Sequence, residues 1–184
     1  MGFSDVRMVE EHSRFLTLLM IEIKILLPER WEEAKRIRLR ALQTDPIAFG
    51  SSYEEEVRLS EADWKSRMKN AIFAVSKEED RAVGTITHTF GDKIKGKHVA
   101  RIFGVYVDPE YRRQGLGRKL MERALEVIRK NKEIVKVQLM VNQEQEVAIK
   151  LYMSFGFFVV GIMKKEIKFG GKFYDELIME KMTP

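Results

Sequence analysis

The chain has no cysteine among its 184 residues. This absence excludes disulfide bonds, zinc-thiolate sites, iron–sulfur clusters and cysteine nucleophiles, and it fits a reducing compartment. The few histidines show no His-x-x-x-His or mixed carboxylate spacing either. The sequence therefore predicts a protein without a metal site.

A long hydrophobic run is also missing. Residues 15–27 form the strongest one, but Glu22 and Lys24 interrupt it and Pro28 ends it, so it is too short and too charged to span a membrane. The N-terminal segment mixes acidic with basic residues and offers no small-x-small cleavage site, which argues against a signal peptide. We therefore expect a cytoplasmic protein without a membrane partner.

No internal repeat or low-complexity linker divides the chain. With 45% hydrophobic and 33% charged residues, the composition is globular, and the length favours one domain whose core needs no metal or covalent crosslink. A second Met-initiated reading begins at Met20, so we treat residues 1–19 as an N-terminal extension and residues 20–184 as the domain. The net charge of +5 would suit an anionic partner, although the alternating signs in residues 29–40 indicate a solvated helix face.

The hydrophobic pattern alternates between the periods of strands and helices. Strands are expected at residues 21–25, 72–76, 83–90, 97–107, 135–141, 157–163 and 173–179, the last two joined by a turn at Gly170 and Gly171. A helix is expected at 31–42, and a loop at 46–56 leads to a second helix that begins with a capping box of Ser60 and Asp63. Two further helices are expected at 116–128 and at 148–155, the last with Gly156 at its C-terminal cap. These elements predict an α/β (α+β) protein with a mixed sheet of about seven strands.

The segment from Val105 to Gly117 runs from the end of a predicted strand into the start of a helix. Gly115 and Gly117 allow a ligand close to the backbone, the first amides of a helix lack intrahelical partners, and the helix dipole favours negative charge there. Basic residues occupy positions 112, 113, 118 and 119. The turn predicts a diphosphate site, although it has neither the Gly-Lys-Ser/Thr of a Walker loop nor the third glycine of a Rossmann fingerprint.

Two motifs resemble those of the GNAT superfamily of acyl-coenzyme A N-acyltransferases. Residues 112–117 read Arg-Arg-Gln-Gly-Leu-Gly and fit the family's coenzyme A pyrophosphate loop, Arg/Gln-x-x-Gly-x-Gly/Ala. Residues 148–157 read Ala-Ile-Lys-Leu-Tyr-Met-Ser-Phe-Gly-Phe and are similar to its Ala-Ile-x-Leu-Tyr-x-x-x-Gly-Phe helix. The order of elements from Met20 to Met182 agrees with the family fold. The resemblance implies a mostly antiparallel sheet flanked by about four helices, with one splayed parallel pair of strands.

The resemblance also implies acetyl-coenzyme A (acetyl-CoA) as the cosubstrate. The strand end at 105–107 would pair with the pantetheine arm, the turn would hold the pyrophosphate, and an amide of Asn142 or Gln145 would contact the coenzyme. The implied binding residues are Val105, Tyr106, Val107, Arg112, Arg113, Gln114, Gly115, Leu116, Gly117, Arg118, Asn142 and Gln145. Tyr152 matches the tyrosine that protonates the departing thiolate in many members, and a phenol with a pKa near 10 suits that role. A packed core aromatic is the alternative for this residue.

The implied reaction is direct attack of a neutral primary amine on the thioester, with the oxyanion stabilised by a backbone amide near residues 105–107. The strand at 99–107 contains no Asp or Glu to deprotonate the amine. The base is therefore an ordered water chain, which we place first, or His98 or one of the carboxylates at 54–56.

On the acceptor side, the resemblance implies Phe49, Gly50, Tyr53 and the carboxylates Glu54, Glu55 and Glu56. We interpret the carboxylates first as an exposed charge run before a helix and second as a group that attracts a cationic amine.

Other interpretations stay open beside an N-acetyltransferase. A protein of the same fold could bind acyl-CoA without catalysis, or use an acyl group longer than acetyl. A basic nucleic-acid-binding module could place the helix that begins at Gly115 on a phosphate backbone, but the chain shows no recognition helix or aromatic platform, and we expect no nucleic-acid partner. The sequence does not identify the amine acceptor, and the resemblance leaves a homodimer open.

Overall fold

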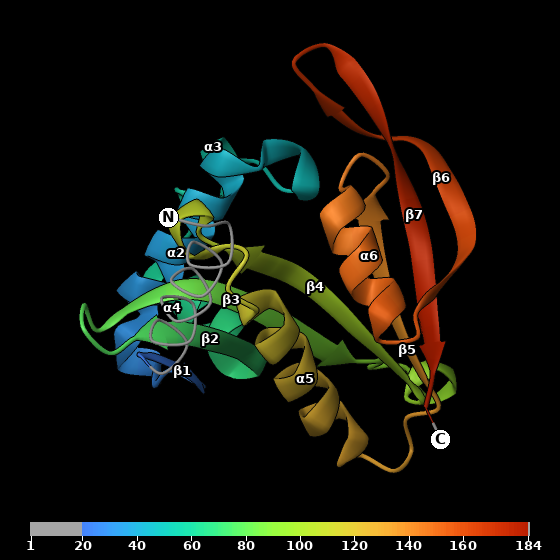
Figure 1. Cartoon of the computed structure of the whole chain (residues 1–184), viewed down its shortest axis with the longest axis horizontal. Helices are drawn as coiled ribbons and strands as arrows, with labels where there is room; N and C mark the ends of the chain where they lie inside the picture. The colour runs from blue at the N-terminus through green and yellow to red at the C-terminus, as the bar shows by residue number, and fades with distance from the viewer. Residues whose placement is uncertain (1–19, 184) are drawn as a thin grey trace, which may run out of the picture.

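A computed structural model describes residues 20–183, which form a seven-stranded mixed sheet with helices on both faces (Figure 1). The strands are β1 (Ile21–Lys24), β2 (Ala71–Ser76), β3 (Arg81–Phe90), β4 (Val99–Val107), β5 (Lys136–Asn142), β6 (Phe158–Phe169) and β7 (Lys172–Met182). The helices are α2 (Trp31–Thr44), α3 (Tyr53–Glu56), α4 (Glu61–Arg67), α5 (Leu116–Arg129) and α6 (Glu146–Ser154). The predicted fold class is confirmed, while the predicted extension at 1–19 lies outside the described residues.

The sheet has the strand order β1-β2-β3-β4-β5-β7-β6. All neighbours are antiparallel except β4 and β5. One face packs against α5 and α6, the other packs against α2 over β2 and β3, and α4 packs against α2. Leu120 and Ile128 on α5 and Ile37 on α2 are fully buried, and each contributes about 1.5–3 kcal/mol of hydrophobic stabilisation.

The parallel pair separates part of the way along. Backbone pairing runs from Val99 opposite Lys136 to Ile102 opposite Leu139, and no pair follows. Strand β4 nevertheless continues to Val107, and β5 continues to Asn142. The splayed parallel pair that the family resemblance implied is therefore present.

A β-bulge at Gly104 accompanies the separation. Opposite β3, the register steps from Phe103, which faces Thr87, to Tyr106, which faces Thr85. Gly104 has a φ of +63°, a left-handed conformation that glycine adopts without the steric cost of a Cβ atom. Because a bulge bends its strand and increases the local twist, it turns the end of β4 away from β5.

Several local predictions are confirmed, and two are wrong in extent. The capping box of Ser60 and Asp63 is present at the start of α4, and Gly156 follows α6 with a φ of +84°. The segment predicted as a loop contains α3, because Ser52 forms a second capping box. Strands β6 and β7 run well past their predicted ends, and in Figure 1 their hairpin extends beyond α6. A bulge that places Lys165 at positive φ lets β6 continue through its charged stretch.

No helix within residues 20–183 is long and apolar enough to cross a membrane.

Candidate active site

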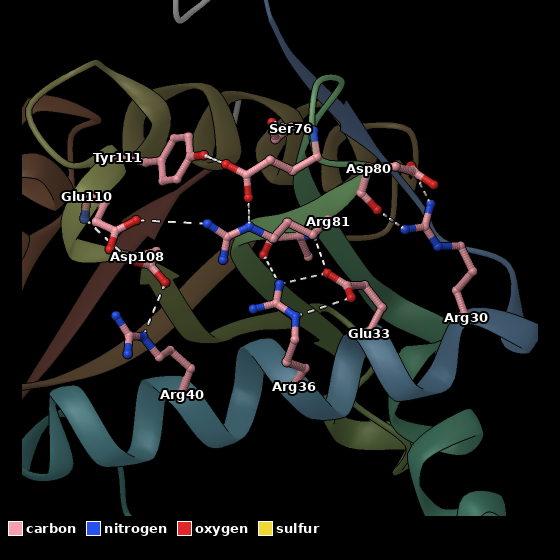
Figure 2. A network of polar contacts seen from close by, with 12 residues as sticks. Arg30, Glu33, Arg36, Arg40, Ser76, Asp80, Arg81, Asp108, Glu110 and Tyr111 are labelled. Atoms are coloured by element: carbon pink, nitrogen blue, oxygen red, sulfur yellow. Dashed lines mark hydrogen bonds and ion pairs between the residues drawn. The ribbon is translucent and has the colours of Figure 1, made fainter.

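Asp108 fixes the turn that follows β4. Its carboxylate is 3% exposed and accepts hydrogen bonds from Arg40 Nε at 3.3 Å and from the Glu110 amide at 3.4 Å. Its own amide donates to the Val83 carbonyl at 2.8 Å, and its carbonyl accepts from the Tyr111 amide at 2.9 Å. Figure 2 shows these groups between α2 and the turn. The turn is thus tied to a helix and a strand that lie far from it in sequence.

More of the same network supports this connection (Figure 2). Arg36 and Glu33 on α2 bond to the backbone carbonyl and amide of Ala82, respectively. The Tyr111 hydroxyl donates to Glu79 at 2.7 Å. Arg81 lies between Glu79 and the turn residue Glu110. Since both sides of the turn are held, α5 begins at a fixed place relative to the sheet.

Arg112 closes the turn onto β4. Its Nε donates to the Val107 carbonyl at 2.9 Å, its guanidinium forms an ion pair with Asp45, and it lies over the Tyr106 ring at 5.8 Å. The guanidinium of Arg112, the first arginine of the glycine motif, is therefore already engaged in contacts within the protein. We infer that Arg112 shapes the turn, which sequence reasoning alone did not show.

Arg118 is also engaged within the protein, because its Nη2 donates to the Ser154 hydroxyl at 2.9 Å and its guanidinium lies over the Phe155 ring, 5.0 Å from the ring centroid. Gln114 donates from its side chain to the Glu110 carbonyl at 3.5 Å. Arg113 differs from both: its side chain is exposed, its φ is +61°, and no polar partner for it is found within residues 20–183. Arg113 is thus available to an anionic ligand.

The backbone of this turn forms an open concavity. Gly115 has a φ of +80° and precedes the first residue of α5, and a Cβ atom added to it would meet nothing within 4 Å. The first amides of α5 have no intrahelical partner. Among the described residues, no side chain donates to or accepts from the backbone of Gly115, Leu116 or Gly117. An anion can therefore approach the amides and the positive end of the helix dipole.

Gly117 joins the turn to α6. A Cβ atom here would lie 3.3 Å from Leu151 Cδ2, which is closer than an ordinary van der Waals contact, so the small residue lets α5 and α6 pack closely. Together with the bond between Arg118 and Ser154, this contact holds the glycine turn at a fixed position relative to the helix that carries Tyr152.

A cavity of about 1270 Å³ lies where β4 and β5 separate. Its wall includes the bulge residues Gly104 and Val105, the end of β5, part of α6 and the segment around α3. Four of the predicted binding or catalytic residues line it, namely Val105, Asn142, Gln145 and Tyr152. All of the predicted acceptor-side residues line it too: Phe49, Gly50, Tyr53, Glu54, Glu55 and Glu56. The fold thus gathers residues from four separate segments around one space.

Tyr152 is 5% exposed and contacts the Phe157 ring edge-on at a centroid distance of 6.2 Å. Burial strongly raises the pKa of its phenol, so the hydroxyl stays protonated at neutral pH. No hydrogen-bond partner for the hydroxyl is found within residues 20–183, and the residue lines the cavity. The ring of Tyr152 is therefore packed in the core, as one interpretation expected, while its hydroxyl is free to donate a proton, as the other expected.

Asn142 and Gln145, the two candidate amides before α6, differ in whether they already form hydrogen bonds within the protein. The Asn142 amide is 1% exposed, donates to the Ile47 carbonyl at 2.9 Å and accepts from the Glu144 amide at 2.9 Å. Both the nitrogen and the oxygen of the Asn142 amide thus already have hydrogen-bond partners within the protein. The Gln145 side chain has no polar partner among the described residues and lines the cavity, so it is the better placed of the two to contact a ligand.

The acidic stretch is not an exposed run throughout, so that expectation is wrong for Glu56. This side chain is 2% exposed and accepts two hydrogen bonds from Arg38, at 2.9 and 2.8 Å, while Arg67 lies 3.0 Å away. Burial alone would raise the pKa of the Glu56 carboxyl, but the hydrogen bonds and charges of the two arginines outweigh it and lower the pKa. Glu54 and Glu55 are exposed as expected.

His88 and His98 do not line the cavity. His98 is exposed and precedes β4, at the end of the strand opposite to the turn. His88 is 4% exposed on β3, where burial lowers its pKa, and it packs edge-on against Phe90. Within residues 20–183, no group of three or more His, Asp or Glu side chains is arranged to hold a metal ion.

Two acidic residues that line the cavity, Glu166 and Glu176, were not predicted from the sequence, and Glu176 is the buried one. Glu176 lies on β7, opposite Asn142 of β5 and Met163 of β6. It is 9% exposed and lines the cavity. In the sequence, its only signal is a carboxylate between Tyr174 and Ile178 at the alternating positions of a strand face, a pattern that solvated strands share.

The sheet with its splayed pair, its bulge and its glycine turn defines an acyltransferase fold of the α/β class. The chain belongs to the acetyltransferase (GNAT) family, whose model matches residues 31–157. Over 58 residues it is 41% identical to the [ribosomal protein bS18]-alanine N-acetyltransferase of Escherichia coli, and the match spans 32% of this chain and 38% of that relative's length.

Solved structures agree on the fold. The acetyltransferase of the GNAT family from Streptococcus pneumoniae superposes with a TM-score of 0.76 at 21% identity, covering 89% of this chain and 99% of that one. A GNAT phosphinothricin acetyltransferase from Sinorhizobium meliloti, in complex with acetyl-CoA, superposes with a TM-score of 0.71 at 16% identity, covering 89% and 88% of the two chains. The predicted family is confirmed.

Proposed function

We propose that this protein transfers the acetyl group of acetyl-CoA to a primary amine by direct attack, without a covalent enzyme intermediate. The observation that carries the proposal is the free hydroxyl of Tyr152 in a cavity that opens between the unpaired ends of β4 and β5. The family membership and the acetyl-CoA complex of a solved relative support the choice of donor.

The donor side follows from the backbone. Beyond Ile102, the edge of β4 that faces β5 has no strand partner, so its amides and carbonyls are available to the amide groups of a pantetheine arm, as an added strand would use them. The Val107 carbonyl is the exception, because Arg112 already occupies it. We place the diphosphate at the amides around Gly115, with Arg113 as the free positive charge.

The acid follows from the protonation state of Tyr152. The thioester carbon becomes tetrahedral when the amine attacks, and an amide near the bulge at Val105 is placed to stabilise the oxyanion. When the carbon–sulfur bond breaks, the phenol gives its proton to the departing thiolate, so the coenzyme leaves as a neutral thiol. Because burial favours the neutral phenol, the group enters each cycle in the acidic form.

The acceptor side combines aromatic and charged groups. Phe49 packs under the Arg38 guanidinium, 4.6 Å from its ring centroid, and Glu56 joins Arg38 to Arg67. This buried cluster gives the wall a fixed shape. An amine carried by a small molecule or by a peptide terminus would lie between this wall and β7.

A thiol-release assay tests the proposal. The protein is mixed with acetyl-CoA and, in separate reactions, a peptide with N-terminal alanine, a free L-amino acid, spermidine and an aminoglycoside, and free thiol is measured with Ellman's reagent. Since the chain has no cysteine, all thiol comes from the coenzyme. Amine-dependent thiol release together with the acetylated amine in the mass spectrum supports the proposal.

Three outcomes would contradict it. Tight binding of acetyl-CoA with no thiol release for any amine indicates an acyl-CoA-binding protein without catalysis. Faster release from hexanoyl-CoA than from acetyl-CoA indicates a longer natural acyl group. Affinity for duplex DNA that falls steeply with salt, in the absence of coenzyme binding, would indicate the nucleic-acid-binding alternative.

A further inference from the structure

Glu176 stands apart from the other buried acids of the described chain. Glu56 is neutralised by two arginines, and Asp108 is bonded to Arg40 and to a backbone amide. Glu176 is nearly as buried, yet no hydrogen bond or ion pair to its carboxylate is found within residues 20–183. Because an unpaired buried carboxylate is costly, such a group is expected to have a partner that is absent from the protein itself.

The facing residues of Glu176 do not supply that partner. On β5 it faces Asn142, whose amide nitrogen donates to the Ile47 carbonyl and forms no bond with Glu176, and on β6 it faces the apolar Met163. The negative charge of Glu166 on β6 repels it. On the hairpin, Lys164 is paired with Asp175 and Lys172 with Glu144, while Lys165 and Lys168 lie over the Phe173 ring. Lys168 and Arg101 line the same cavity, but neither forms an ion pair with the Glu176 carboxylate within residues 20–183.

These surroundings also change the acidity of the group. Burial, reinforced by the negative charge of Glu166, raises the pKa of the Glu176 carboxyl. A higher pKa makes a carboxylate a stronger proton acceptor, which is the usual way in which a carboxyl group is adapted to act as a base near neutral pH.

We propose that Glu176 binds the ammonium group of the acceptor and takes its proton before the amine attacks the thioester. This inference rests on the proposed function. It assigns the role of base to Glu176, whereas the sequence had suggested a water chain, His98 or one of the carboxylates at 54–56. Among those groups, Glu56 is held by two arginines and His98 lies outside the cavity. Glu176 shares the cavity wall with Tyr152, the proposed acid.

The step balances in protons and bonds. The ammonium gives one proton to the Glu176 carboxylate and becomes a neutral amine with a free electron pair. That pair forms the carbon–nitrogen bond, and the carbon–sulfur bond breaks with its electrons on sulfur. Tyr152 protonates the thiolate and recovers a proton from the new amide nitrogen. Glu176 then releases its proton to water, so one proton leaves per turnover.

The test compares Glu176→Gln with Glu176→Asp and with the control Glu144→Gln. The control makes the same change in net charge at an exposed residue outside the cavity, where Glu144 pairs with Lys172. For each protein, the acetyl-CoA affinity is measured by calorimetry, and kcat/KM is measured from pH 6 to 10 with the best acceptor of the amine panel.

We expect Glu176→Gln to lose about 10²–10⁴-fold in kcat/KM at pH 7, the range for a removed general base. The loss should shrink as the pH rises, because more of the amine is then neutral without help. Acetyl-CoA affinity should not change, Glu176→Asp should recover part of the activity, and Glu144→Gln should behave as the native chain.

Three results would overturn the assignment. If the native chain acetylates an amine and Glu176→Gln is equally active at pH 7, Glu176 is not the base while the proposed function stands. If Glu176→Gln loses activity by the same factor at every pH, or loses acetyl-CoA affinity, the residue has only a structural role. If the native chain binds acetyl-CoA but acetylates no amine, the proposed function fails and the assignment fails with it.

Discussion

The glycine turn offers the sharpest test of the donor site, through the substitution Gly115→Glu. Gly115 has a φ of +80°, and its missing Cβ atom would point into open space. A Cβ atom there therefore meets no protein atom, and the side chain is attached directly before the free amides of α5. The substitution adds a negative charge where we propose that the diphosphate binds.

The magnitude can be worked out from two terms. The left-handed conformation costs a side-chain-bearing residue about 1–2 kcal/mol in folding stability. Each pair of unit charges 4 Å apart repels by about 1 kcal/mol in water and by more near a protein surface. With two charges on the diphosphate, binding weakens by at least about 2 kcal/mol, which corresponds to about a 30-fold increase in the Kd of acetyl-CoA.

Gly170→Glu is the matched control. Gly170 has a φ of +56°, and nothing lies within 4 Å of its missing Cβ atom either, but it belongs to the turn between β6 and β7. Both variants should lose similar stability in urea unfolding, and only Gly115→Glu should lose acetyl-CoA affinity in calorimetry. Native affinity in Gly115→Glu, or an equal loss in both variants, would refute the assignment of the turn.

Three further predictions concern single side chains. Tyr152→Phe should lower kcat by about 10²–10⁴-fold with unchanged acetyl-CoA affinity, and an unchanged kcat would show that the residue has only a packing role. Because burial raises the pKa of the phenol, deprotonation of Tyr152 should cause no loss of native activity below about pH 10. Glu56→Gln should cost about 3–5 kcal/mol in urea unfolding, because it leaves two arginines without their buried partner. The folded-state pKa of Glu56 is lowered, so its stabilisation is present above the unfolded value of about 4.3 and is lost as the pH falls below it. Burial lowers the pKa of His88, so the unfolded chain takes up its proton first and thermal stability should fall as the pH drops below about 6.5, a slope that His88→Leu should reduce.

Local patterns explain why much of the fold could be predicted from the sequence. Helix α5 buries the residues whose spacing marked one helical face, including Leu120 and Ile128, because a period of 3.6 residues is visible without knowledge of the partner surface. The positive φ angle of Gly156 at the end of α6 was indicated in the same way, because glycine is preferred at a left-handed C-terminal cap.

The features that could not be predicted depend on contacts between distant segments. Glu56 looks like its exposed neighbours in sequence, and only the approach of α2 and α4 brings Arg38 and Arg67 to it. Arg112 matches a binding motif, but its partner Asp45 lies 67 positions earlier in the chain. In both cases, the residue type and its neighbours in sequence do not show which groups the fold will place beside it.

Strand polarity explains how one space can hold both the proposed acid and the proposed base. Strand β5 runs parallel to β4, so the splayed ends of both strands open at the same edge of the sheet. The same β5 runs antiparallel to β7, and its last residue, Asn142, therefore lies opposite Glu176. Helix α6 begins four residues after the end of β5 and carries Tyr152 back along the sheet. A single strand thus connects the donor cleft, the phenol and the buried carboxylate.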